Sequence, residues 1–138
     1  MPARDIYHNN VKNALIKDGW TVTHDPFRLS WGGKDMYVDL GAEQVMAAEK
    51  ADRKIAVEIK SFIGLSEMDE IENALGQYLV YRSVMARTEP DRILYLAIHN
   101  EAFVDIFEQP LGNLLREDYQ VQLMVYDLRA EVVLKWIP

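Results

Sequence analysis

The sequence contains no cysteine and no long hydrophobic run. Without cysteine there is no disulfide and no thiolate metal site, so any bound metal must use oxygen or imidazole ligands. No apolar stretch approaches the length that spans a bilayer, and residues 1–5 lack the hydrophobic segment of a secretory signal. We therefore expect a cytoplasmic protein that does not bind membranes.

Basic residues are also in short supply, because 15 Lys and Arg against 22 Asp and Glu give a formal net charge of -7. This balance argues against a protein that coats nucleic acid through bulk charge, since non-specific affinity comes mainly from phosphate neutralisation. Any contact with DNA would have to be local, metal-assisted or shared with another subunit. The acidic surface is equally suited to docking a basic protein.

The chain has 138 residues, of which 49% are hydrophobic. This is enough to bury one compact core, so we expect a single domain over residues 1–138. Whether identical copies associate is left open by the sequence.

Apolar spacing and breaker residues predict helices that alternate with strands. Helices are expected over 3–19, from a Ser66 cap to 89, and from 100 towards 110 with a further turn over 111–116. Strands are expected over 20–24 with an extension over 27–31, and over 36–40, 44–50, 55–60, 92–99, 121–128 and 132–137. The charged patch 50–54 is expected to form a hairpin turn. This order predicts an α/β sandwich with a mixed sheet.

The most informative stretch of the chain is the apolar run that contains Glu58 and Lys60. Side chains alternate between the faces of a strand, so Glu58 and Lys60 share one face and Ile55, Val57 and Ile59 share the other. Burying a carboxylate is costly unless something compensates its charge. The pair therefore indicates a site that holds a metal, a phosphate or both.

A second carboxylate, Asp39, interrupts the apolar run 36–40. Asp39 and Glu58-x-Lys60, placed after an N-terminal helix and before a long helix, resemble the PD-(D/E)xK nuclease superfamily. That resemblance implies a restriction-endonuclease-like sandwich, with a central mixed β-sheet flanked by helices. It also implies that Asp39, Glu58 and the backbone carbonyl of Ile59 hold Mg²⁺ or Mn²⁺, while Lys60 stabilises the charge on a phosphate during hydrolysis.

The long helix carries a further candidate pair, Gln77 and Tyr81. The two residues are one turn apart and therefore lie on one face. The spacing resembles the Q-x-x-x-Y element of RecB-like members of that superfamily, which implies that Gln77 orients the metal site. Gly76 costs about 1 kcal/mol relative to alanine inside a helix, and we expect it where the backbone packs closely against the sheet.

Longer runs spread over nearly the whole chain resemble the XisH family of fdxN-element excision controlling factors. They are Arg4-Asp5, His8, Asp18 to Thr21, Thr23 to Pro26, Val38 to Glu43, Ala47 to Lys50, Ile55 to Phe62, Ala74 to Tyr78, Pro90 to Arg92 and Trp136-Ile137. The resemblance implies an endonuclease-like fold, a role in programmed DNA rearrangement and a XisI-like protein partner.

Two functions follow from this resemblance. The first is a Mg²⁺-dependent endodeoxyribonuclease, or an accessory factor, that acts on DNA during excision. The second is a catalytically inactive module that binds a XisI-like partner and a recombinase, with Asp39, Glu58 and Lys60 as a structural ion pair.

Other polar residues have alternative roles as well. Asp5 and His8 are candidates to reach the carboxylates, although we favour capping or solvated roles. His24 and His99 border strands, and we favour surface or hydrogen-bonded roles. Glu43 and Glu49 either join the acidic cluster or flank the hairpin.

Overall fold

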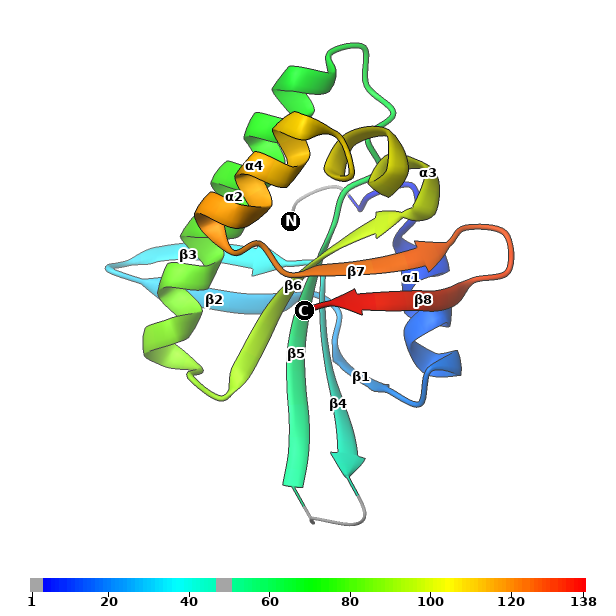
Figure 1. The fold of residues 1–138 in the computed structure, drawn as a ribbon. Coiled ribbons are helices and arrows are strands. Elements are labelled where there is room, and N and C mark those ends of the chain that lie inside the picture. The colour runs from blue at the N-terminus through cyan, green and yellow to red at the C-terminus, as the bar shows by residue number, and fades with distance from the viewer. Residues whose placement is uncertain (1–3, 47–50) are drawn as a thin grey trace.

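A computed structural model describes residues 4–46 and 51–138. The chain forms a six-stranded sheet, a separate two-stranded hairpin and helices on both sides (Figure 1). In chain order the elements are α1 (His8–Lys17), β1 (Thr21–His24), β2 (Phe27–Trp31), β3 (Lys34–Val38), β4 (Leu40–Met46), β5 (Ala51–Ile59), α2 (Glu67–Thr88), β6 (Arg92–His99), α3 (Asn100–Ala102), the π-helical turn η1 (Phe103–Phe107), α4 (Pro110–Tyr119), β7 (Leu123–Asp127) and β8 (Val132–Ile137).

The main sheet is mixed, with strand order β1-β4-β5-β6-β7-β8. The central pairs β5–β6 and β6–β7 are parallel, and the other pairs are antiparallel. The expected mixed α/β architecture is therefore confirmed. Within the described residues, no helix combines the length and the apolar character needed to cross a membrane.

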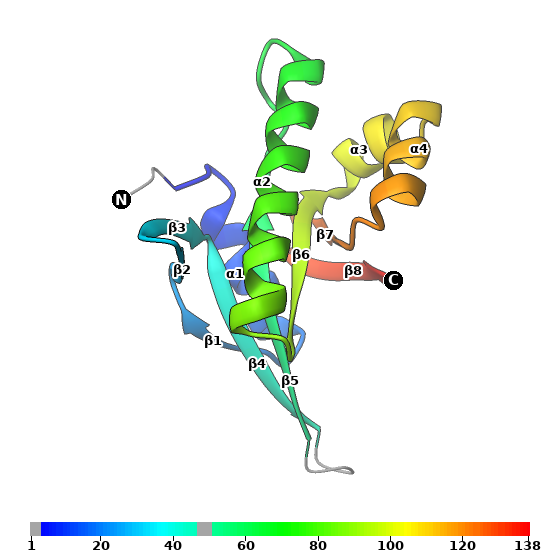
Figure 2. The same cartoon turned by 90° about the vertical axis from the view of Figure 1, so that its left-hand side faces the viewer.

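The two faces of the sheet carry separate apolar cores. Tyr78 of α2 packs with Leu96 on one face, whereas Leu15 of α1 packs with Val57 on the other. Figure 2 shows α2 in front of the strands and α1 behind them. Ala56 packs in the core on the α2 side of the sheet. Because side chains alternate along β5, Glu58 faces the same side as Ala56, as the sequence pattern predicts.

Several element boundaries differ from those expected. Helix α1 begins at His8, and residues 4–7 lie outside it, while residues 1–3 are outside the described residues. Strand β2 does not extend β1 but pairs with β3 through a turn at Gly32-Gly33, where φ is 57° and 76°. Two positive φ values in succession suit the twist of a hairpin and favour glycine.

The charged patch over 51–54 is part of β5 and not a turn. Its residues pair with β4, with Lys54 opposite Glu43 and Arg53 opposite Gln44, so the ladder satisfies the backbone while the charges stay at the surface. The last part of the strand expected over 44–50 lies outside the described residues. Asp39 occupies a bend between β3 and β4, not the middle of a strand.

Elements in the second half agree more closely with expectation. Ser66 caps α2, since its Oγ accepts a hydrogen bond from the Asp69 N–H at 3.2 Å. Strands β6 and β8 match the predicted ranges, and β7 is slightly shorter than expected. The last helix, α4, runs over Pro110–Tyr119 and is longer than the single turn expected.

Candidate functional site

A cavity of about 390 Å³ brings together all the candidate site residues. It lies where the end of β5, strand β3, the bend after β3 and helix α2 meet. Its walls include Asp39, Glu58, Ile59, Lys60, Gln77, Asp5, Asp35, Met36, Tyr37 and Tyr81. The spatial convergence predicted from the sequence is present, and the chemical roles of these residues stay predictions.

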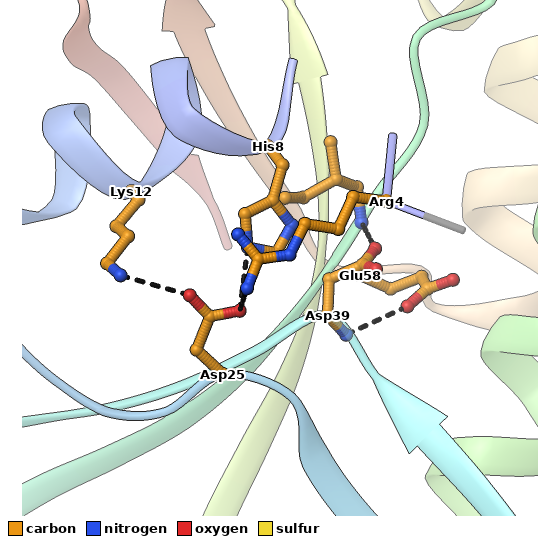
Figure 3. A network of polar contacts seen from close by, with 7 residues as sticks. Arg4, His8, Lys12, Asp25, Asp39 and Glu58 are labelled. Carbon is orange, nitrogen blue, oxygen red and sulfur yellow. Dashed lines mark hydrogen bonds and ion pairs between the residues drawn. The ribbon is translucent and has the colours of Figure 1, made fainter. Parts of the chain in front are cut away.

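Asp39 and Glu58 are joined through the backbone of the two strands (Figure 3). The Asp39 N–H donates to Glu58 Oε1 at 3.3 Å, and the Ile59 N–H donates to Asp39 Oδ2 at 2.8 Å. The pairing of Leu40 with Val57 aligns β4 and β5, so Asp39 must come to lie beside Glu58. The sheet register therefore positions both carboxylates.

Lys60 forms an ion pair with Glu58. Its Nζ lies 3.8 Å from Glu58 Oε2, and the Lys60 side chain is 24% exposed against 7% for Glu58. The Lys60 N–H donates to the Ala97 carbonyl at 3.1 Å, so the extended backbone continues one residue beyond β5. That continuation keeps Glu58 and Lys60 on one face, as strand alternation requires.

The two carboxyl groups are strongly perturbed by burial and by each other. Burial, followed by the negative charge of Asp39, raises the pKa of Glu58 to about 9, and Lys60 offsets only part of this effect. Burial also raises the pKa of Asp39, against the opposing effect of the Ile59 N–H. Without an added cation, the pair therefore retains a proton at neutral pH.

Gln77 and Tyr81 form the α2 wall of the cavity. Burial, then the charges of Glu58 and Asp39, raise the pKa of Tyr81 to about 12. Its hydroxyl accordingly stays protonated and able to donate a hydrogen bond at neutral pH. The explanation offered for Gly76 is wrong, because a methyl group added there would meet only open space.

A network around Asp25 lies beside the carboxylate pair (Figure 3). His8 Nε2 is 2.8 Å from Asp25 Oδ1, Lys12 Nζ is 3.0 Å from Oδ2, and Arg4 Nη2 is 3.5 Å from Oδ1. Burial by itself would raise the pKa of Asp25, but the hydrogen bonds from Lys12 and His8 outweigh it and lower the pKa. The network ties the start of α1 to the link between β1 and β2.

This network was not predicted, although the sequence contains a signal for it. His8 and Lys12 are four residues apart, which places both on one side of α1, and Arg4 precedes the helix by the same spacing. His8 is buried and bonds to Asp25 instead of bordering the cavity. Asp5 does border the cavity, and its Oδ1 accepts the Tyr7 N–H at 2.9 Å in the turn before α1. The favoured capping role is not present, because Tyr7 is the N-cap residue of α1 and has no side-chain cap.

The other histidines have the hydrogen-bonded roles favoured from sequence. His99 Nδ1 accepts the Ala102 N–H at 3.4 Å, so His99 Nε2 carries the hydrogen that faces the Ser61 carbonyl at 3.1 Å. His24 Nδ1 lies 2.9 Å from Thr23 Oγ1 at the surface.

Glu43 does not join the acidic cluster. It lies on β4 and its Oε1 is 3.7 Å from Arg92 Nη2, away from the cavity walls. Arg92 is buried and also bonds to Glu89 and to the Ile55 carbonyl, so this group braces the sheet. Glu49 lies outside the described residues.

Sequence reasoning also missed the contribution of the hairpin to the cavity. Asp35 and Tyr37 of β3 line it together with Asp39. These three residues alternate along an extended segment, so strand periodicity contained the signal. The strand expected over 36–40 begins one residue after Asp35, so the expectation left Asp35 out.

The donor set at the cavity suits a hard divalent cation. Within residues 4–46 and 51–138, no three His, Asp or Glu side chains gather closely enough to bind a metal by themselves. Mg²⁺, however, is commonly bound through one or two carboxylates together with waters and substrate phosphates. The buried carboxyl of Glu58 and the partly buried carboxyl of Asp39, in a cavity that Ile59 also lines, fit that description.

Comparison with known proteins identifies a family to which this chain is similar over nearly its whole length. The model of the XisH protein family matches residues 1–134. A crystal structure of an XisH family protein from Nostoc punctiforme is 38% identical with a TM-score of 0.88, covering 97% of this chain and 100% of that one. A crystal structure of an fdxN element excision controlling factor protein from Anabaena variabilis is 39% identical with a TM-score of 0.88, covering 98% and 100%. Among curated proteins, none matches this chain.

Proposed function

This chain belongs to the XisH family, and from that premise we propose that it controls the excision of a DNA element by cutting DNA. In this proposal the fold is restriction-endonuclease-like, of the PD-(D/E)xK type. The cavity at Asp39, Glu58 and Lys60 binds a divalent cation and hydrolyses a phosphodiester bond.

The observation that carries the proposal is the convergence of two carboxylates, a lysine and two α2 side chains on one cavity. Asp39 and Glu58 come from adjacent strands, Lys60 continues the second strand, and Gln77 and Tyr81 face them from α2. A purely structural ion pair needs neither a cavity nor a second carboxylate, and the second carboxylate makes the pair less stable when ionised.

Asp39, Glu58 and the backbone carbonyl of Ile59 would hold Mg²⁺ or Mn²⁺. Such an ion, when bound, polarises a phosphate and lowers the pKa of water. The residues fit because burial raises the pKa of both carboxyl groups, and the charge of Asp39 raises that of Glu58 further, so the pair keeps a proton that a cation would replace.

The remaining residues act directly on the substrate in this proposal. Lys60 Nζ, near Glu58 but partly exposed, places positive charge where negative charge develops on the phosphate. The Tyr81 hydroxyl, kept protonated, donates a hydrogen bond to a phosphate oxygen or to water. The Gln77 amide orients the water or a carboxylate from the same helix face.

One observation favours a second function, a binding module for a XisI-like protein. Ile63, Leu65 and Met68 lie between β5 and the first turn of α2, and all three side chains are exposed. Several exposed apolar side chains close in sequence are typical of a surface that binds another protein. In this alternative a recombinase cuts the DNA. This chain binds its protein partners and contacts DNA only as part of their complex.

A cleavage assay separates the two functions. Duplex, nicked and branched DNA are incubated with Mg²⁺ or Mn²⁺ and either wild type, Asp39→Ala or Lys60→Ala, with and without a co-expressed XisI-like protein. Asp118→Ala is the matched control, because Asp118 is an exposed acid on α4. Cleavage that requires Asp39 and Lys60 but not Asp118 supports the nuclease. Cleavage unaffected by both substitutions, or absent on every substrate, supports the binding module.

A further inference from the structure

A second hollow of about 340 Å³ lies on the same side of α2 as the carboxylate cavity. It is lined by Trp31 at the end of β2 and by Ser83, Val84 and Arg87 of α2. The indole of Trp31 is 53% exposed, although it stands beside a helix that could have covered it. We call this second hollow the Trp31 hollow.

The two hollows follow one seam between the β2–β3 hairpin and α2. The carboxylate cavity uses Tyr37 and Tyr81, whereas the Trp31 hollow uses Trp31, which is paired with Lys34, and Arg87. The step from Tyr37 to Lys34 along a strand is about 10 Å. The step from Tyr81 to Arg87 along a helix is about 9 Å. Both elements therefore place the Trp31 hollow roughly 10 Å from the cavity.

The charge along this seam changes sign. The carboxylate cavity is acidic, with the acids Asp5, Asp35, Asp39 and Glu58 against Lys60. One of these acids, Asp35, is paired with Arg28 at 2.9 Å. Beside Trp31 the charges are basic, because Lys34 and Arg87 have no carboxylate partner among the residues that the structure describes.

Arg87 is available to an anion because its one hydrogen bond uses the carbonyl of its own helix. Arg87 Nη1 donates to the Ser83 carbonyl at 3.1 Å, which leaves the rest of the guanidinium free to donate. Although the chain has a net charge of -7, an exposed indole close to two basic groups without a carboxylate partner offers the stacking surface and local positive charge that a single nucleic acid strand binds.

We propose that the Trp31 hollow binds an unstacked nucleobase of the same DNA strand whose phosphate enters the carboxylate cavity. This inference rests on the proposed nuclease function and specifies its substrate. Phosphates are about 3.4 Å apart along the axis of a stacked strand and farther apart where bases are unstacked, so a span of roughly 10 Å places the contact at most about three nucleotides from the scissile phosphate. Trp31 stacks on the base, and Arg87 and Lys34 contact the flanking phosphates.

The substrate is accordingly DNA that has a single-stranded segment close to the cut. Bases inside a duplex are stacked on their neighbours and cannot lie flat on an indole, whereas bases in a tail, gap or branch can. A blunt duplex should bind more weakly and should not depend on Trp31.

The test measures the Kd of fluorescein-labelled tailed duplex and blunt duplex by anisotropy, with Ca²⁺ in place of Mg²⁺. We expect Trp31→Ala to weaken binding of the tailed duplex by about tenfold or more, and Trp31→Phe to restore most of it. Arg87→Ala should lower the slope of log Kd against log salt by about one. Arg129→Ala is the charge-matched control, because Arg129 is exposed between β7 and β8.

Distinct outcomes separate this inference from the nuclease proposal. Three results would overturn the inference: Kd values that do not change in Trp31→Ala and Arg87→Ala, an equal loss of affinity for the tailed and the blunt duplex, or no binding of DNA by wild type. The hollow would then suit a protein partner. Trp31-dependent binding of tailed DNA without cleavage would contradict the hydrolytic function alone. Thermal unfolding of each variant checks that the fold is retained.

Discussion

The Ile59 N–H donates to Asp39 Oδ2 at 2.8 Å, across the junction where the chain passes from the hairpin into the main sheet. Through this hydrogen bond, the backbone of the central strand β5 fixes the position of the Asp39 carboxylate. Asp39 therefore keeps its position through the pairing of β4 with β5, and the site does not depend on a flexible loop.

The buried carboxylates should make the metal-free protein less stable as pH rises. The folded-state pKa of Glu58 is about 9 against 4.5 for the ordinary group, so the folded state holds the extra proton between these values. Stability then falls with rising pH across that window, by at most about 1.4 kcal/mol per pH unit. The raised pKa of Asp39 acts in the same direction.

Glu58→Gln should flatten this pH dependence, because the amide does not ionise. Urea unfolding of the chelator-treated protein at pH 5 and pH 8 measures the effect. Wild type is expected to lose more stability between the two pH values than Glu58→Gln does. An equal loss in both proteins would show that Glu58 is not the group responsible.

Asp25→Asn should destabilise the protein by about 1–3 kcal/mol at neutral pH, because it weakens charge-assisted hydrogen bonds to His8 and Lys12. The pKa of Asp25 is lowered in the folded state, so its contribution is present above the ordinary value of 3.8 and is lost as pH falls through the folded value. The variant should therefore approach wild type in stability at low pH. A constant difference at all pH values would be inconsistent with this assignment.

Gly112→Ala should be strongly destabilising. A methyl group there would overlap the backbone of Ile106 and Phe107, where α4 abuts η1. Backbone cannot move aside cheaply, so we expect a loss of about 1–3 kcal/mol in urea unfolding. A neutral result would mean that α4 is not seated against η1 as described.

Gly76→Ala serves as the opposite case on α2. The added methyl group meets nothing within 4 Å, and alanine is favoured over glycine in a helix by about 0.5–1 kcal/mol. We expect a gain of that size in the free energy of unfolding. A loss would indicate that this part of α2 contacts something in solution.

The periodicity of strands and helices predicted which of the candidate site residues share a face. Two-residue alternation placed Glu58 and Lys60 on one face, and four-residue spacing placed Gln77 and Tyr81 on another, because both follow from local backbone geometry. The meeting of Asp39 with this group depended on the hairpin expected between the strands over 44–50 and 55–60 and on the family pattern, since the spacing of Asp39 from Glu58 does not by itself bring them together.

The parts that the sequence did not reveal depend on contacts between distant segments. Strand β2 could have extended β1 by its own composition, but it pairs with β3 and packs Leu29 into the α2 core. The charges at Arg53 and Lys54 suggested a turn, although the end of a strand also accepts charged side chains that point to solvent. Asp25 joins α1 only once the sheet has brought the two together.

Calorimetric titration of the metal-free protein with Mn²⁺ and with Mg²⁺ tests the central claim most directly. The account predicts one cation per chain, with an affinity that increases as pH rises and with release of protons from Asp39 and Glu58 on binding. This binding should be lost in Asp39→Ala but not in Asp118→Ala. Absence of binding by wild type, or equal binding by wild type and Asp39→Ala, would contradict it.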